Sequence, residues 1–377
     1  MIQMRRGDYL PKKQRNHLFF SQKNLTKTIE RLFYATERIA SGVSCPITFE
    51  LHVRAHWQRF LYKQHRGRLM KSSCDTTVVT AGDQAYSWGV FLLVASMRRN
   101  GMPQPVVVGA MDWTDKMKNL VLSLGNVTIV DVPRSRQCMA CQKPAMMASD
   151  AVKTEWVCWV DSDGLFVGDC TEWLTGSDSD EVRIKRSDPP PPDFTPENLA
   201  IWQRDVKRFL GQALPESRYA TRVQSGVILL HRKWRPFLAR WDAQIKNVLP
   251  SDVGILMEKG SAYYQTDESV LSSLLCFDLD VPNVSETYKF DGKIDRKRFY
   301  AHFGYNPKPW QMWNSFASKW REETYLTVEW LVENDYVKIC EVPFPLRRNW
   351  WPLYHCLTPV APWVWRLKKL KRKLLGS

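Results

Sequence analysis

The sequence of 377 residues predicts an α/β protein with a parallel sheet that helices cover on both faces. Two observations lead to this prediction. Short, continuously apolar runs rich in β-branched residues recur from Thr76 onward, as in strands buried on both faces. Longer segments of helical length alternate with them. The composition, 44% hydrophobic and 25% charged, suffices for a large core and excludes a disordered chain, a collagen and a coiled coil.

The predicted strands have the length and composition of buried strands. They are TTVVTA (76–81), PVVVGA (105–110), VTIVDV (127–132), EWVCWV (155–160), SGVILLH (225–231) and RFYAHF (298–303). In a parallel sheet, ligands bind outside the carboxyl ends of the strands. The residues that follow TTVVTA and EWVCWV are therefore the first candidates for a functional site.

The predicted helices lie between and after these strands. They are SWGVFLLVASMRR (87–99), WTDKMKNLVLSLG (113–125), KPAMMASDAV (143–152), PENLAIWQRDVKRFL (196–210), RPFLARWDAQIKNVL (235–249) and TDESVLSSLLCF (266–277). Thr195 and Pro196 form a typical helix start. Two more helices are expected before the sheet, at 25–40 and 50–64.

One stretch interrupts the α/β pattern. Residues 178–198 are first acidic, then basic, and contain four consecutive prolines at 189–192. Such a run favours polyproline II and excludes a helix. It could form an exposed linker or a mobile lid, and we expect a loop within one domain because the α/β pattern resumes after it. The chain is then divided into a basic N-terminal extension (1–71), an α/β domain (72–345) and a basic, aromatic C-terminal tail (346–377).

The net charge of +15 is concentrated at the two ends. The first 31 residues hold eight Lys and Arg against two acids, and the stretch 366–373 holds six and no acid. The body between them is close to neutral. Basic ends favour a polyanionic partner, either nucleic acid or an anionic membrane surface, although a solvated charge run is the simpler interpretation.

The nine cysteines do not form a metal-binding pattern. Only Cys138 and Cys141 make a CxxC, and a zinc site needs about four ligands at close spacing. The N-terminus has no signal-peptide pattern, and no apolar run of transmembrane length occurs. These features predict a cytoplasmic protein with free thiols.

The motif WVCWVDSDGLFVGD is the strongest local signal. Asp161 and Asp163 directly follow a buried strand, where two carboxylates can approach one divalent cation. Two other DxD triplets, at 178–180 and 278–280, warn that the pattern alone is common. The apolar sequence on both sides of Asp161 and Asp163 makes uncompensated charges costly there, which favours a metal site.

The motif HFGYNPKPW (302–310) is the second signal. His302 ends a predicted strand, and Gly304 permits a close backbone approach. Lys308 lies between two prolines on a stiff segment. A neutral imidazole can bind a metal and a lysine can hold a phosphate, although a single histidine is more often structural.

Together these motifs resemble the GT-A glycosyltransferases, and in particular glycosyltransferase family eight, the glycogenin and lipopolysaccharide galactosyltransferase group. TAGDQAYSWGVFLLVASM resembles the family's first strand and helix, and QKPAMM with the following strand and DSD resembles its Lys–helix–DxD segment. SGVILLH and HFGYNPKPW resemble its NSG strand and its HxxGxxKPW motif. The resemblance covers roughly 76–313 and implies a GT-A fold, a Rossmann-like mixed sheet flanked by helices.

The resemblance also implies roles for individual residues. The divalent cation, Mn²⁺ or Mg²⁺, would be held by Asp161, Asp163 and His302. The nucleotide-sugar donor, with a UDP-sugar favoured, would be bound by Thr80, Ala81, Asp83, Tyr86, Lys143, Ser162, Gly304 and Lys308. The residues at the transferred sugar and its diphosphate would be Asp163, Asp267 and Lys308. The acceptor would be a saccharide or a lipid-linked glycan.

Two segments depart from the family pattern. Gln224 stands where the family usually has Asn in NSG, and DQGLLN appears here as DESVLS, so that only Asp267 is kept. Because these segments shape the sugar side, the identity of the donor sugar stays open. The family retains the anomeric configuration, which is implied here by resemblance alone. A divalent cation and a lysine would stabilise the diphosphate leaving group electrostatically.

The C-terminal PWVWRLKKLKRKLLGS predicts a short basic helix lying on a membrane surface. On a helix, Trp363, Leu367, Leu370 and Leu374 fall three or four residues apart, with basic residues between them. A peripheral position on the cytoplasmic face of a membrane would bring the enzyme beside lipid-linked acceptors. A tail that packs on its own domain is the alternative.

Two other functions remain open at this stage. A nucleic-acid-binding protein could use the basic ends and the aromatic residues, but no nucleic-acid-binding motif occurs and the body is near neutral. We therefore expect no nucleic acid partner. A degenerate transferase fold could serve as a scaffold that binds sugar nucleotides without turnover. The intact set of Asp161, Asp163, His302 and Lys308 favours an enzyme.

Overall fold

The computed structural model describes residues 75–176, 178–187, 190–191, 193–285 and 300–367. The basic extension 1–71, with its two expected helices, lies outside the described residues, as does the end of the C-terminal tail. The domain boundaries at 72 and 346 stay predictions. Within the described residues, no helix is both long and apolar enough to cross a membrane.

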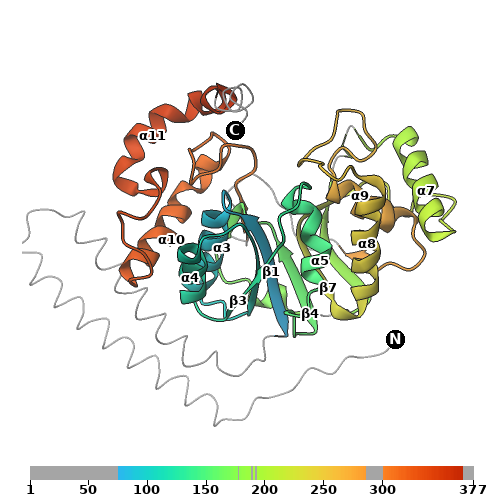
Figure 1. Ribbon diagram of the computed structural model, residues 1–377, viewed down its shortest axis with the longest axis horizontal. Coiled ribbons are helices and arrows are strands. Elements are labelled where there is room, and N and C mark those ends of the chain that lie inside the picture. The colour runs from blue at the N-terminus through green and yellow to red at the C-terminus, as the bar shows by residue number, and fades with distance from the viewer. Residues whose placement is uncertain (1–74, 177, 188–189, 192, 286–299, 368–377) are drawn as a thin grey trace, which may run out of the picture. The chain divides into compact units, whose positions relative to one another are not determined.

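The centre of the molecule is a seven-stranded mixed sheet in the order β3-β2-β1-β4-β7-β6-β8 (Figure 1). Four neighbouring strands are parallel, as the sequence predicted. They are β1 (Thr76–Asp83), β2 (Val106–Met111), β3 (Val127–Asp131) and β4 (Trp156–Val160). Their carboxyl ends meet at one edge, where Asp83 and Asp161 follow in the chain.

The prediction of a parallel sheet is wrong for the other half. β7 (Val223–His231) runs antiparallel to β4, and β6 (Glu181–Arg186) runs antiparallel to β7. Only β8 (Asn283–Ser285) adds another parallel pair, with β6. The apolar sequence of β7 indicates burial on both faces but carries no information on strand direction. The result is a mixed sheet flanked by helices, which the family resemblance implied.

The stretch 178–198, which we expected to be a loop, contains strand β6. The residues of EVRIKR alternate between buried and partly exposed positions, and Val182 and Ile184 are buried. This alternation is the pattern of a strand with one face in the core. The strand has only six residues and precedes a run of prolines, so its pattern was too weak to predict it from the sequence.

Two layers of helices cover the sheet (Figure 1). On one face lie α3 (Ser87–Arg99), α4 (Asp115–Ser123) and α10 (Arg321–Glu333). On the other face lie α5 (Lys143–Met147), α7 (Pro196–Leu210), α8 (Arg235–Val248) and α9 (Asp267–Phe277). The described residues also contain the short helices α6 (Thr171–Leu174) and α11 (Trp351–Leu357).

Alternate strand residues supply the two cores. Val78 and Cys158 point into the first, and their neighbours Val79 and Trp159 point into the second. This period of two is what a sheet buried on both faces requires.

The helix boundaries follow local signals. α3 and α7 have the predicted limits, and the Thr195 hydroxyl accepts a hydrogen bond from the Asn198 amide at 3.3 Å, as an N-cap does. Gly125, which has a φ of +74°, follows the end of α4. α5 ends at Met147, five residues before the predicted end at Val152, and its C-terminal residues continue as a turn.

A second, two-stranded sheet brings distant parts of the chain together. β5 (Gly164–Phe166) follows the DSD turn, and β9 (Tyr300–His302) pairs with it antiparallel. The register places Gly164 opposite His302. A Cβ at Gly164 would lie 2.4 Å from the Tyr300 ring, so only glycine permits this pairing. The small sheet therefore delivers His302 to the DSD turn.

Candidate metal and donor site

The carboxylate of Asp161 is fixed at the point where β4 leaves the sheet. Its backbone amide donates to the Gly226 carbonyl of β7 at 2.8 Å. The Trp159 indole donates to Oδ1 at 2.7 Å, and the Tyr300 hydroxyl donates to its carbonyl at 2.6 Å. These contacts from three strands hold the carboxylate at the carboxyl edge of the sheet, where the sequence placed it.

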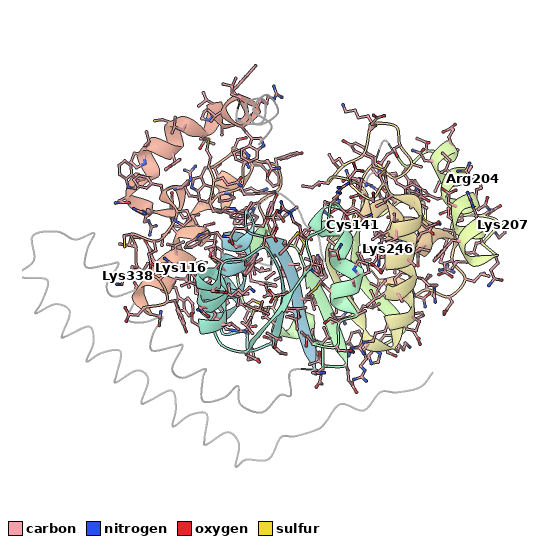
Figure 2. The ribbon with its side chains drawn as sticks, in the orientation of Figure 1. Lys116, Cys141, Arg204, Lys207, Lys246 and Lys338 are labelled. Carbon is pink, nitrogen blue, oxygen red and sulfur yellow. The ribbon has the colours of Figure 1, made fainter. Side chains whose placement is uncertain are left out.

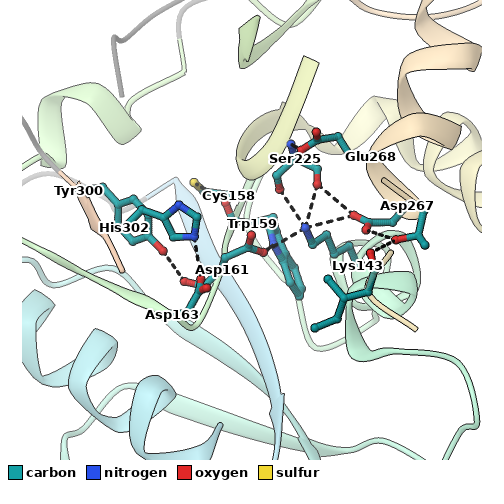
Figure 3. A network of polar contacts seen from close by, with 12 residues as sticks. Lys143, Cys158, Trp159, Asp161, Asp163, Ser225, Asp267, Glu268, Tyr300 and His302 are labelled. Carbon is teal, nitrogen blue, oxygen red and sulfur yellow. Dashed lines mark hydrogen bonds and ion pairs between the residues drawn. The ribbon is translucent and has the colours of Figure 1, made fainter. Parts of the chain in front are cut away.

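His302 reaches the second carboxylate of the motif (Figure 3). The Phe303 amide donates to the Asp163 carbonyl at 2.8 Å, which extends the pairing of β5 with β9 by one residue. The His302 Nε2 atom then lies 3.1 Å from Asp163 Oδ1. One ligand atom from each of Asp161, Asp163 and His302 lies within 4.8 Å of the others, so these three side chains can share one cation.

Lys308 binds the other oxygen of the same carboxylate. Its Nζ donates to Asp163 Oδ2 at 2.7 Å and to the Gly304 carbonyl at 2.5 Å, and the residue is only 5% exposed. Gly304 has a φ of +50°, and a Cβ there would lie 2.7 Å from the Phe316 ring. Both constraints require glycine at the turn that folds Lys308 back towards Asp163.

The charges around the two aspartates differ. Burial would raise the pKa of Asp163, but His302 and Lys308 outweigh it and hold that pKa far below its usual range. Burial raises the pKa of Asp161. The charge of Lys143 opposes this rise only in part, and the like charge of Asp163 adds to it. Burial would lower the pKa of His302, yet the Asp163 charge raises it. The hydrogen bond to Asp163 and the charge of Asp161 add to this effect, and together they outweigh burial.

These three side chains fit a divalent cation of the hard or borderline kind. Two carboxylates and one imidazole supply two oxygen ligands and one nitrogen ligand, a set suited to Mn²⁺. A cation between the two carboxylates would also relieve their repulsion. Within the described residues, no other group of three or more His, Cys, Asp or Glu side chains is suitably close. The CxxC at 138–141 therefore has no further zinc ligands there.

A second cluster adjoins Asp161 (Figure 3). The Lys143 Nζ lies 3.0 Å from Asp161 Oδ1, 3.1 Å from Asp267 Oδ2 and 2.9 Å from the Ser225 hydroxyl. The hydroxyl in turn donates to Asp267 at 3.0 Å. Burial would lower the pKa of Lys143, but the two carboxylates raise it above its usual range, so the ammonium stays charged. Helices α5 and α9 thus meet β4 and β7 through one buried lysine.

Glu268 lies beside this cluster but has different partners. Its carboxylate accepts from the Ser225 amide at 2.8 Å and lies 3.1 Å from Arg222 Nη1. Burial raises its pKa from 4.5 to about 7, although Arg222 opposes the shift. The carboxyl is therefore close to half protonated near neutral pH.

The residues expected around the nucleoside lie in the C-terminal half of β1 and, for Tyr86, directly after it. Thr80 is fully buried, and its hydroxyl has no hydrogen-bond partner among the described residues, while Ala81 is 6% exposed. Asp83 Oδ1 accepts from the Tyr86 amide at 3.0 Å, and the Tyr86 ring meets Trp310 edge-on with centroids 5.7 Å apart. Burial raises the pKa of Tyr86, and the nearby Asp163 charge adds to the shift.

Ser162 is the middle residue of the DSD turn, and its position depends on α3. It is 7% exposed, and its carbonyl would lie 2.4 Å from a Cβ at Gly89 of α3. The twelve predicted residues therefore lie at or near the carboxyl edge of the sheet. Four are around β1 and α3, three form the metal cluster, Ser162 is in the DSD turn, Gly304 and Lys308 lie behind it, and Lys143 and Asp267 lie alongside.

Four residues in contact with this site were missed by the sequence analysis. Trp159 and Tyr300 bond Asp161, while Ser225 and Glu268 bond the Lys143 cluster or each other. Trp159 and Tyr300 each lie two residues before a predicted metal ligand, Asp161 and His302. Because residues two apart in a strand lie on the same face, this spacing could have indicated both of them. Ser225 stands in SGVILLH at the serine of the family's NSG. Nothing local distinguishes Glu268 from an ordinary first-turn helix acid.

No protein-family description matches the chain, and no curated protein matches it in sequence. Solved structures that are similar include the galactosyltransferase LgtC in complex with donor and acceptor sugar analogues, at 16% identity over 53% of this chain and 70% of that one, with a TM-score of 0.35. GlyE of Streptococcus pneumoniae is 17% identical over 68% of this chain and 63% of its own, with a TM-score of 0.44. The bifunctional glycosyltransferase WbbM is 14% identical over 71% of this chain and 52% of its own, with a TM-score of 0.43.

Proposed function

We propose that this protein is a metal-dependent glycosyltransferase of the GT-A type. It would transfer a sugar from a nucleotide-diphosphate donor, with a UDP-sugar favoured, to a saccharide or lipid-linked acceptor. One observation carries the proposal: Asp161, Asp163 and His302 converge within 4.8 Å at the carboxyl edge of the sheet, with the Lys308 ammonium 2.7 Å from Asp163. Two carboxylates, an imidazole and a lysine are what binding of a cation and a diphosphate requires.

Asp161, Asp163 and His302 would hold Mn²⁺, which when bound would neutralise charge on the diphosphate leaving group. Lys308 would donate from Nζ to a diphosphate oxygen, exchanging part of its present contact with Asp163. Tyr86 and Asp83 would bind the nucleoside, since both lie where β1 passes into α3. Lys143 and Asp267 would orient the hydroxyls of the transferred sugar, since an ammonium donates to a hydroxyl oxygen and a carboxylate accepts from its proton.

The first experiment measures hydrolysis of a panel of UDP-sugars and GDP-sugars with Mn²⁺ and with EDTA. Slow hydrolysis without an acceptor requires no knowledge of the acceptor. Asp161→Asn is the test variant. Asp178→Asn is the matched control, because Asp178 begins another DxD triplet and is exposed in a loop. We expect one donor to be consumed by the wild type and the control in Mn²⁺ alone, and not by Asp161→Asn.

The opposite results would discriminate the alternatives. The proposal is wrong if the wild type shows no metal-dependent hydrolysis and no metal-dependent thermal shift with any UDP or GDP compound. Nucleotide-sugar binding without turnover, in the presence of candidate acceptors, would indicate a scaffold. Salt-sensitive binding of RNA or DNA without metal would favour a nucleic-acid-binding protein.

The proposal extends to stereochemistry. We propose that transfer retains the anomeric configuration, as the sequence resemblance implies. Once the donor is known, NMR of the first product formed gives its anomer directly. Inversion would require a carboxylate base on the acceptor, and it would contradict this part of the proposal alone.

We also propose that the C-terminal region rests on an anionic membrane surface on the cytoplasmic side. The observation that supports it is a group of exposed apolar side chains between 350 and 367, which includes α11 and the residues on either side of it. They are Trp350 (38% exposed), Leu353 (47%), Val360 (43%), Trp363 (65%) and Leu367 (66%). Six basic residues between 366 and 373 continue the sequence. Aromatic and aliphatic side chains beside basic residues are typical of interfacial helices.

A further inference from the structure

Cys138 and Cys141 form a closely spaced thiol pair. The Cys141 amide donates to the Cys138 carbonyl at 3.0 Å, which closes a tight turn, and the two Sγ atoms lie 3.7 Å apart. Both cysteines are free. A disulfide has an S–S distance of about 2.05 Å, so a small movement within this turn would join the two sulfurs.

The two thiols differ in their surroundings. Cys138 is half-buried, while Cys141 is only 1% exposed. The contact between the two sulfurs lowers the pKa of Cys138, and the same contact together with burial raises the pKa of Cys141. Cys138 is therefore the sulfur that an external reagent meets, and Cys141 is the resolving thiol behind it.

The pair is coupled to the donor site through the chain. Cys141 is two residues before Lys143, the first residue of α5 and the residue that pairs with Asp161 and Asp267. Figure 2 labels Cys141 beside the start of this helix. Lys143 is 3% exposed, so its ammonium has no room to follow a shift of its own backbone without losing these contacts.

The turn also touches the segment that leads to Asp267. The Cys138 amide donates to the Val253 carbonyl at 2.9 Å. Two residues further along, the Ile255 carbonyl accepts from the Thr266 hydroxyl at 3.0 Å, directly before Asp267. The thiol pair therefore lies between the two segments that deliver Lys143 and its partner.

We propose that Cys138 and Cys141 are a reversible redox site that controls the position of Lys143 and hence donor binding. The oxidant is a low-molecular-weight disulfide. The Cys138 thiolate attacks it, breaks its S–S bond and releases one half as a thiol after protonation. Cys141 then loses its proton, attacks the Cys138 sulfur and displaces the second half as a thiol. Two protein thiols are oxidised by two electrons, and one small disulfide is reduced to two thiols.

The test equilibrates the full chain in buffers of reduced and oxidised glutathione, blocks free thiols and maps the disulfide by peptide mass. Cys138→Ser is the test variant. The double variant Cys340→Ser/Cys356→Ser is the matched control, since both of these cysteines are exposed. We expect a 138–141 disulfide in the wild type and the control and none in Cys138→Ser. Its absence at every glutathione ratio would overturn the proposal.

Hydrogen–deuterium exchange over 143–147 then reads out the coupling without reference to activity. We expect faster exchange of α5 in the oxidised protein, reversed by dithiothreitol, and no effect of oxidant on Cys138→Ser. If exchange is unchanged although the disulfide has formed, the proposal that the thiol pair controls the position of Lys143 is wrong.

The effect on donor binding rests on the proposed function. We expect the oxidised protein to bind a UDP-sugar with Mn²⁺ about tenfold more weakly, the loss expected for one charge-assisted contact. Equal affinity in the two forms would contradict it. Absence of binding even by the reduced protein would instead refute the proposed function, while disulfide mapping and exchange would still decide whether the redox site exists.

Discussion

At the scale of single residues, Lys308 and His302 share one carboxylate but need not share one role. Both contact Asp163, through different oxygens. Replacement of Lys308 removes a positive charge beside two metal-binding carboxylates, whereas replacement of Asp163 removes a ligand. Replacement of Asp163 should therefore weaken cation binding and replacement of Lys308 should not, whereas both should reduce turnover.

We expect Lys308→Met to reduce the rate of donor hydrolysis by about 100-fold to 1000-fold, as for loss of one preorganised electrostatic contact. It should leave Mn²⁺ affinity unchanged or tighter, because a repulsive charge is gone. Electron paramagnetic resonance of free Mn²⁺ measures the affinity. Lys116→Met, at an exposed position of α4 (Figure 2), is the control. Loss of Mn²⁺ affinity as large as in Asp163→Asn would contradict this division of roles.

Glu268 should make stability depend on pH. Its pKa is raised from 4.5 to about 7 in the folded state, mainly by burial, so the folded state binds the proton more tightly than the unfolded state. The stability contributed by protonation is complete below pH 4.5 and is lost as the pH rises through 7. In Glu268→Gln this contribution cannot titrate.

We therefore expect the free energy of unfolding of the wild type to fall relative to Glu268→Gln by roughly 1–3 kcal/mol as the pH rises through this window. Denaturant titrations at several pH values measure the difference. Glu341→Gln is a suitable control, because that carboxylate is on the surface, paired with Lys116. A constant difference between wild type and Glu268→Gln would show that Glu268 does not titrate in this range.

At the scale of elements, the start of α3 is packed against the DSD turn. A Cβ at Gly89 would lie 2.4 Å from the Ser162 carbonyl and 2.5 Å from the Trp310 ring. Helix α3, the DSD turn and the 302–310 motif therefore pack closely together at Gly89, where there is no room for a side chain.

We expect Gly89→Ala to destabilise the protein by about 1–3 kcal/mol, as overpacking does, and to weaken Mn²⁺ binding because the turn must move. Gly168→Ala is the matched control, since a Cβ there meets nothing within 4 Å. Thermal unfolding and Mn²⁺ titration of the two variants provide the comparison. Equal behaviour would mean that α3 adapts without displacing Ser162.

The elements also indicate where sequence reasoning succeeds. α3 and α7 were predicted to the residue, because a long apolar face and a Thr–Pro start are local features. β6 was missed because six residues next to a run of prolines carry a weak pattern. The direction of β7 is a property of the connection and of its neighbours, which no window of sequence contains.

The candidate site follows the same division. Asp161, Asp163 and His302 could be named because the DSD and HFGYNPKPW motifs occur in the order of a known family, and the structure brings the three residues together. Glu268 could not be named from the sequence. Its pKa is raised by burial and lowered by Arg222 and the Ser225 amide, which are 46 and 43 residues away along the chain. Contacts between distant elements depend on the tertiary structure and cannot be predicted from a short stretch of sequence.

At the scale of the whole molecule, the exposed C-terminal side chains and the basic residues that follow them in the sequence should bind an anionic membrane surface. We expect the full chain to sediment with vesicles that contain anionic lipid and not with neutral ones, and the binding to weaken with salt. Trp363→Ala/Leu367→Ala should reduce binding by about tenfold or more through lost apolar burial. Leu279→Ala/Ile339→Ala, at comparably exposed positions elsewhere, is the control. Equal binding of both double variants would contradict a role for Trp363 and Leu367 in membrane binding.

The pairing of β5 with β9 has a consequence for the assembly of the protein. The ligand atoms of Asp163 and His302 are 139 residues apart in sequence, so a chain that has reached only the first of them holds two carboxylates and no imidazole. The cation would bind tightly only after the last third of the chain has folded back onto the sheet. Binding confined to the folded state adds directly to its stability. Metal affinity would then serve as a measure of completed folding, and an ion-loaded protein would be one in which β9 has paired with β5.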